Sequence, residues 1–124
     1  MSSVIVYRRK HLRVKLVKDD VAVTKLFNGR KRAHGLPSVN AYYEYPDDEY
    51  PKDMGLMVFP LKDAGVSHHD LVAHECVHAA FCRARKRHPS LAAVSDEVEE
   101  SIAAMTGELT AKIVQLLKGK KVID

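Results

Sequence analysis

The sequence predicts a small α+β domain, and three patterns support this fold class. Apolar and basic residues alternate over residues 12–17, as in a half-buried strand. Residues 70–88 are rich in good helix formers and contain neither glycine nor proline, which predicts a long helix. An apolar stripe with the helical period follows over residues 98–116. A chain of 124 residues suffices for one core but not for two, so we expect a single domain over residues 1–124.

The first third of the chain predicts two strands and a helix. Residues 4–7 are β-prone and precede the alternating strand. An acidic pair at 19–20 can cap a helix over residues 20–33, which Gly35 would end. The Asn-Gly pair at 28–29 is also a signal for a hairpin turn, so this helix has an alternative.

Two further strands are expected before the long helix. Residues 38–45 form a β-prone, aromatic segment, and a polar loop with two prolines follows over residues 46–53. Residues 55–60 are short and nearly all apolar, and Pro60 ends this strand because proline cannot donate to a ladder. The expected architecture is a short β-sheet packed on the long helix and on a C-terminal helix.

The long helix carries the motif His-Glu-x-x-His at residues 74–78. Residues four apart lie on the same face of a helix, so His74 and His78 can direct two imidazoles at one Zn²⁺ ion. Glu75 is rotated by about 100° from His74, close enough to take a proton from a water molecule beside the metal. Ser67 or Asp70 can cap the start of this helix, and Pro89 ends it. The alternative is a pair of ordinary histidines on an amphipathic helix.

The C-terminal segment predicts a second long helix. Ser95 is a good N-cap, and the acidic residues after it favour the positive end of the helix dipole. The helix is expected to continue to about residue 117, with Gly119 as its stop. Its apolar stripe consists of Val98, Ile102, Met105, Leu109, Ile113 and Leu116.

Composition and charge limit the partners and the compartment. Hydrophobic residues make up 46% and charged residues 29%, as in ordinary globular proteins, and no apolar run is long enough to span a bilayer. The start of the chain does not resemble a signal peptide, so we expect a cytoplasmic protein. The net charge of +4 permits binding to nucleic acid, but scattered solvated charge is the favoured interpretation. Cys76 and Cys82 are too far apart on one helix for a disulfide and are expected to pack as small apolar residues.

A catalytic zinc site needs a third protein ligand besides the two histidines. Residues 79–84 lack the His-x-x-Gly-x-x-His extension of the metzincins, which favours a glutamate on a second helix. The downstream candidates are His88, Asp96, Glu97, Glu99 and Glu100.

Around these residues the chain resembles the gluzincins, the thermolysin-like zinc metallopeptidases. In that family a glutamate some twenty residues past the second histidine is the third ligand, and Glu100 follows His78 by 22 residues. The family pattern Glu-Ala-Ile-Ser-Asp-Ile-Phe-Gly-x-Leu matches residues 100–109 at Glu, Ile, Gly and Leu, which favours Glu100 over Glu99. Helical geometry agrees less well, because Glu100 is opposite the apolar stripe. The family's aspartate four residues after the ligand is replaced by Ala104.

The resemblance implies a minimal zincin, similar in size to small metallopeptidase-like proteins encoded by phages and prophages. Zn²⁺ would be bound by His74, His78 and Glu100, with Glu75 as general base in the hydrolysis of peptide bonds. The strand just before the active-site helix is expected to line the cleft and to bind extended substrate by edge pairing. The oxyanion-stabilising residue is left open among Tyr42, Tyr43, Tyr45, Tyr50 and His88.

The other function considered is a non-catalytic, zinc-containing module that binds a protein or nucleic-acid partner. Glu75 argues against it, because a purely structural site has no need for a base beside the metal. A third option is a zinc hydrolase that acts on an amide other than a peptide. His68 and His69, just before the motif, are expected to be solvated residues at the start of the helix.

Overall fold

The computed structural model describes residues 2–6, 10–30, 35–36, 38–45, 53–62, 65–87 and 96–124. These residues form a small α+β structure with the element order β1 (Ser2–Val6), β2 (Lys10–Val17), α1 (Asp20–Asn28), β3 (Tyr42–Glu44), β4 (Asp53–Pro60), α2 (His68–Arg87) and α3 (Asp96–Gly119). Among the described helices, none combines the length and the apolar character that a membrane crossing requires.

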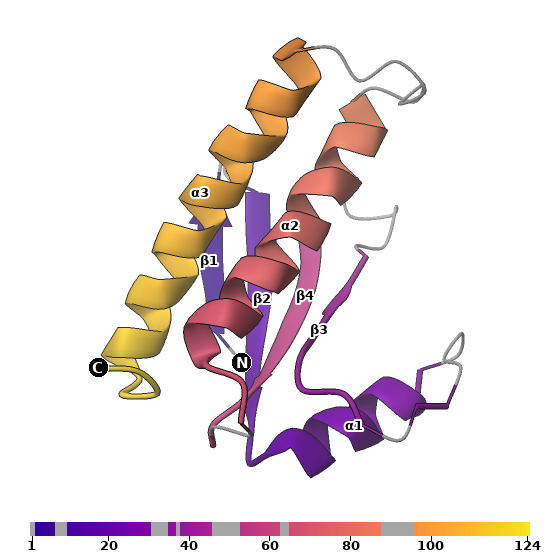
Figure 1. Ribbon diagram of the computed structural model, residues 1–124, viewed down its shortest axis with the longest axis vertical. Helices are drawn as coiled ribbons and strands as arrows, with labels where there is room; N and C mark the ends of the chain where they lie inside the picture. The colour runs from indigo at the N-terminus through magenta and orange to yellow at the C-terminus, as the bar shows by residue number, and fades with distance from the viewer. Residues whose placement is uncertain are drawn as a thin grey trace.

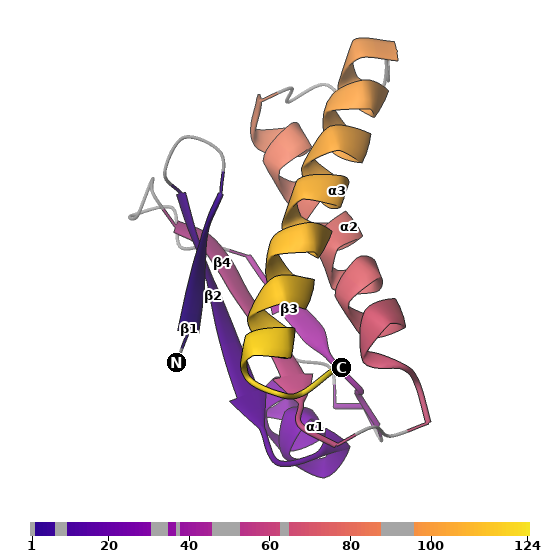
Figure 2. The same cartoon turned by 90° about the vertical axis from the view of Figure 1, so that its left-hand side faces the viewer.

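The described strands form one four-stranded sheet in the order β1-β2-β4-β3. β2 and β4 are parallel at its centre, while β1 and β3 are antiparallel to their neighbours at the two edges. Figure 1 shows α2 and α3 side by side across one face of the sheet, and Figure 2 shows the two layers from the side. The strand directly before α2 is therefore a central strand, which corrects the expectation that it offers a free edge to substrate. On that side of the sheet the free edge belongs to β3, the neighbour of β4.

The main core lies between the sheet and the α2–α3 pair. Alternation along β4 divides its side chains between two faces, so that Met57 and Phe59 join this core while Val58 faces the other way. Val58 belongs to a smaller cluster with Val23 of α1 and Tyr42 of β3. The largest fully buried members of the main core are Leu12, Val14, Met57, Phe59, Val72, Cys76, Leu109, Ile113 and Leu117.

α1 and β3 are both shorter than their sequence patterns predicted. Asp19 caps α1 by accepting a hydrogen bond from the backbone N–H of Ala22 at 2.9 Å, but the helix ends at Asn28, with Gly29 as its C-cap. The predicted continuation to residue 33 is therefore wrong at residues 29–30, and residues 31–34 lie outside the described part of the chain. Only residues 42–44 of the predicted strand 38–45 pair with a neighbour. Val39 instead exchanges hydrogen bonds with Thr24 of α1.

The two long helices agree closely with the prediction. Ser67 caps α2 by accepting a hydrogen bond from the N–H of Asp70 at 3.2 Å. In α3, Val98, Leu109 and Ile113 are buried as the stripe predicted, while Leu117 is fully buried and its neighbour Leu116 only partly so. The predicted cap Ser95 lies outside the described residues. Cys76 and Cys82 are free and buried, as expected.

His68 departs from the expectation of a solvated helix start. Its side chain is buried, and its Nε2 lies 2.8 Å from the carbonyl oxygen of Pro60, the last residue of β4. Since only a donor can satisfy that carbonyl, Nε2 carries the proton in this contact. His68 thus connects α2 to the end of β4, whereas His69 is exposed as predicted.

Candidate metal centre

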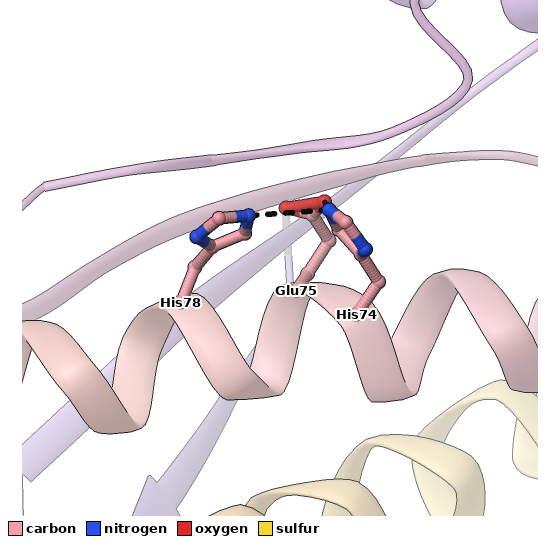
Figure 3. Close-up of side chains that lie close together, drawn as sticks. All are labelled: His74, Glu75 and His78. Carbon is pink, nitrogen blue, oxygen red and sulfur yellow. Dashed lines mark hydrogen bonds and ion pairs between the residues drawn. The ribbon is translucent and has the colours of Figure 1, made fainter.

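The motif residues converge on one side of α2. Figure 3 shows the side chains of His74, Glu75 and His78 rising together from the helix, with the two imidazoles turned toward each other. The two Nε2 atoms are 3.1 Å apart, and the ring planes meet at 70°. Among the described residues these three form the group that could hold a metal ion, with donor atoms that all lie within 4.8 Å of one another.

The separation of the two Nε2 atoms suits a shared metal ion. With metal–nitrogen bonds of about 2.0–2.1 Å, two ligands of a tetrahedral zinc ion lie about 3.3 Å apart. The 3.1 Å between His74 and His78 is close to this value. Two neutral imidazoles can satisfy each other in only one way, with one nitrogen donating and the other accepting. A divalent cation would accept both lone pairs, and imidazole is a ligand that zinc and similar ions prefer.

In Figure 3 the carboxylate of Glu75 lies between the two imidazoles, and Glu75 is far less exposed than the histidines. Only 4% of its surface is accessible, and Oε1 is 3.9 Å from Nε2 of His74, whose side chain is 69% exposed. Burial raises the pKa of the Glu75 carboxyl from 4.5 to about 7. A carboxyl that exchanges protons near neutral pH is suited to general acid–base chemistry.

The protonation of His78 also favours metal binding. Burial, followed by repulsion from His74, lowers the pKa of the His78 imidazole. The neutral imidazole is the form that binds a metal, so a lowered pKa extends the ligand form to lower pH.

A cavity of about 350 Å³ opens beside the motif residues. Helix α2 contributes one wall, and the opposite wall comes from the end of α1, the segment before β3, and β3 with the residue after it. Aromatic rings dominate that opposite wall. The described lining residues are Phe27, Arg30, Val39, Ala41, Tyr42, Tyr43, Tyr45, His74, Glu75 and His78.

The β3 wall is held close to β4 by two local features. Gly55 has a φ of +99°, and a Cβ at this position would collide with the carbonyl oxygen of Glu44 on β3. The hydroxyl of Tyr43 donates a 2.6 Å hydrogen bond to the carbonyl oxygen of Met54. These features fix the edge strand that faces His74 and His78.

The predicted third ligand is not part of the cluster. Glu99 and Glu100 are both exposed near the start of α3. α2 contacts both α3 and β3, and in Figure 1 it lies between them. The ribbon of α3 in Figure 3 passes on the side of α2 opposite the imidazoles. The described structure therefore joins His74, Glu75 and His78 but leaves Glu100 apart, and its role as a ligand stays a prediction.

The remaining candidates divide into those within the cavity and those outside the described residues. Tyr42, Tyr43 and Tyr45 all line the cavity, which keeps them as candidates for stabilising an oxyanion. Tyr50 and His88 lie outside the described part of the chain, as do the side chains of Asp96 and Glu97.

Arg30 lines the cavity, but the sequence analysis did not single it out, because the basic residues of the chain were interpreted as scattered solvated charge. The available signal was its position directly after the Asn-Gly pair at residues 28–29, where a helix can end and turn a side chain inward.

Comparison with known proteins gives no relative: no family model, no curated protein and no solved structure matches this chain.

Proposed function

We propose that this protein is a zinc-dependent metallopeptidase. The observation that carries the proposal is the convergence of His74 and His78 on one point, beside the buried carboxyl of Glu75 and within an open cavity. A pair of surface histidines without a function has no need to bring both Nε2 atoms together. A purely structural metal site has no need for a third, non-ligand carboxyl beside them.

In this proposal the three motif residues of α2 have separate chemical roles. His74 and His78 hold the zinc ion, which supplies Lewis-acid chemistry that acidifies water and polarises a carbonyl. Glu75 takes a proton from the attacking water and then delivers it to the nitrogen of the departing amine. Its burial keeps the carboxyl away from bulk water, and a pKa near neutrality suits both the acceptance and the return of that proton.

The third ligand follows from the resemblance to gluzincins, and we propose Glu100. Its carboxylate is exposed on α3 in the described structure. Coordination by Glu100 therefore requires the first turns of α3 to change position relative to α2 when the metal binds. Glu99 is the alternative from the same turn.

The position of β3 at an edge of the described sheet supports the proposal that the substrate is a peptide. β3 ends the described sheet on the side of the cavity, so its outer edge can pair with an extended main chain. Tyr42 and Tyr45 then lie on the wall that faces the reacting bond, where a phenol hydroxyl can stabilise negative charge.

Metal content and peptide cleavage, measured on the same preparations, test the proposal. The wild type and Glu75→Gln should each bind one zinc per chain, and His78→Ala should lose it. Only the zinc-loaded wild type should cleave a mixture of peptides. If Glu75→Gln loses the metal, Glu75 is a ligand and not the base. Zinc binding without cleavage of any peptide would favour the non-catalytic binding module.

A further inference from the structure

We propose that Arg30 selects substrates that carry a carboxylate near the bond to be cleaved. The proposal rests on the peptidase function proposed above and adds the class of substrate. The carboxylate belongs either to an aspartate or glutamate side chain or to the C-terminus of a short peptide.

The end of α1 holds Arg30 in a defined position. The carbonyl oxygen of Phe27 accepts hydrogen bonds from the backbone N–H of Arg30 at 3.3 Å and from its Nε at 3.1 Å. The guanidinium carbon lies 3.8 Å from the centre of the Phe27 ring and 5.0 Å from that of Tyr42. These two rings contact each other edge to face, with centroids 5.6 Å apart. Arg30 is therefore anchored by both hydrogen bonding and cation–π contact.

This anchoring leaves the outer part of the guanidinium for a ligand. Arginine has five N–H donors, and the contact with Phe27 uses the one on Nε. Within the described part of the chain, no ion pair joins Arg30 to a carboxylate. The two terminal nitrogens form the fork that matches the two oxygens of a carboxylate. A side chain already held in place loses little entropy when it binds.

Arg30 also stands apart from the rest of the cavity by its charge. Among the described lining residues it is the one side chain that is charged at every physiological pH, because the others are apolar, aromatic, or histidine and glutamate at the metal centre. Besides the metal ion, a carboxylate in this cavity would therefore meet one fixed cation, the guanidinium of Arg30. A lysine or arginine in the same place would be repelled, which gives selectivity against basic peptides.

Lys25 offers a matched control on α1, the helix that ends just before Arg30. It is exposed and lines a second cavity, between α1 and β2, which Arg30 also borders but which contains none of the motif residues. Lys25→Met removes one positive charge from α1 without touching the cavity of the metal centre. Arg30→Met removes a charge of the same sign from within that cavity. Any effect of overall charge is common to both variants.

Binding to the zinc-loaded Glu75→Gln protein tests the proposal without turnover. The probes are four fluorescent hexapeptides: neutral with an amidated C-terminus, the same with one glutamate, the same with one lysine, and neutral with a free C-terminus. We expect at least one carboxylate peptide to bind about 10- to 100-fold more tightly than the neutral amide, the range of a charge-assisted bidentate contact. The glutamate and free-terminus probes separate the two sources of the carboxylate.

Arg30→Met, added to Glu75→Gln, should remove this preference, and Arg30→Lys should restore part of it because charge returns without the fork. Lys25→Met should retain the full preference. Thermal unfolding of each variant confirms that it is folded. A preference that survives in Arg30→Met, or that is absent with Arg30 intact, overturns the proposal. Cleavage by the wild type is a separate readout. Equal cleavage of acidic and neutral peptides would reject the role of Arg30 alone, whereas no cleavage with the binding preference intact would reject the peptidase function alone.

Discussion

The two sides of helix α2 carry different kinds of residue, buried and apolar on one side, exposed and metal-binding in type on the other. On the side toward β4 and α3, Val72, Cys76 and Ala79 are fully or almost fully buried, and their small volumes let α3 approach. On the side toward α1 and β3, His74 and His78 are exposed and contact each other through their donor atoms. On the packed side the volume of each side chain determines how well it fits, whereas on the open side the donor atoms of the imidazoles determine what can bind. An exposed pair contributes little to folding, so its convergence is best explained by function.

Glu75 lies at the boundary between these two sides and combines their properties. It is as buried as the apolar residues beside it, yet it carries a carboxyl with no apolar role. Burial of such a group costs free energy when it is charged. The residues of the open side, and Glu75 above all, should therefore control activity, while residues of the packed side control stability.

The largest expected effect is the loss of catalytic rate in the Glu75→Gln variant. Removal of a general base costs about 10²- to 10⁴-fold in rate, and the amide retains the size of the side chain while it loses proton transfer. Cleavage of a peptide by the zinc-loaded variant should fall by this factor, with one zinc still bound per chain. The matched control is Glu108→Gln on α3, which removes a partly exposed carboxylate and an ion pair with Lys112 at 3.3 Å. A loss of activity in both variants would contradict the assignment of Glu75.

The next largest effect is a loss of stability when a buried residue of the packed core is truncated. Ile113 of α3 is fully buried in the core that includes Val72 and Cys76. Ile113→Ala should lower the free energy of unfolding by about 2–5 kcal/mol, through lost burial and the cavity that it leaves. Urea unfolding measures this change. Where the variant is folded, its zinc content should equal that of the wild type, because the imidazoles lie on the other side of α2. Loss of zinc from the folded variant would show that the two sides are not independent.

The sequence predicts the packed side and the motif better than it predicts the cavity. The motif helix follows from its helix-forming residues and the absence of glycine and proline, and the apolar stripe of α3 follows from its helical period; both are confirmed. The cavity depends on contacts between segments that are distant in the chain. The hydrogen bonds of Thr24 with Val39 and of Tyr43 with Met54 join residues 15 and 11 positions apart, and such contacts have no local signal in the sequence. The gluzincin-like spacing and sequence pattern predicted Glu100 as the third ligand, but neither determines how α3 docks against α2.

Glu75 should also make the stability of the metal-free protein depend on pH. Its pKa is about 7 in the folded protein and near 4.5 in the unfolded chain, so the folded state holds the proton more tightly. Stability from this group is therefore complete below about pH 4.5 and is lost as pH rises through 7. Glu75→Gln removes this titration. With a chelator present, the variant should equal the wild type near pH 4 and exceed it by about 3 kcal/mol at pH 8. Parallel pH profiles for the two proteins would show that the carboxyl is not destabilised by burial.

The smallest effect on folding, and the sharpest contrast between the two sides, is expected from His78→Ala. In the metal-free protein this exposed substitution should change the free energy of unfolding by less than about 0.5 kcal/mol, as surface substitutions usually do. Zinc at 100 times its dissociation constant should stabilise the wild type by about 2.7 kcal/mol, because a ligand that binds only the folded state shifts the equilibrium by mass action. His78→Ala should lose this stabilisation, whereas Arg85→Ala, exposed two turns further along α2, should keep it. Glu100→Ala extends the comparison to α3: loss of the zinc effect would identify Glu100 as a ligand that reaches the metal only when the metal binds, and a full zinc effect would exclude it. A large loss of metal-free stability in His78→Ala would mean that the open side of α2 is part of the folding core after all.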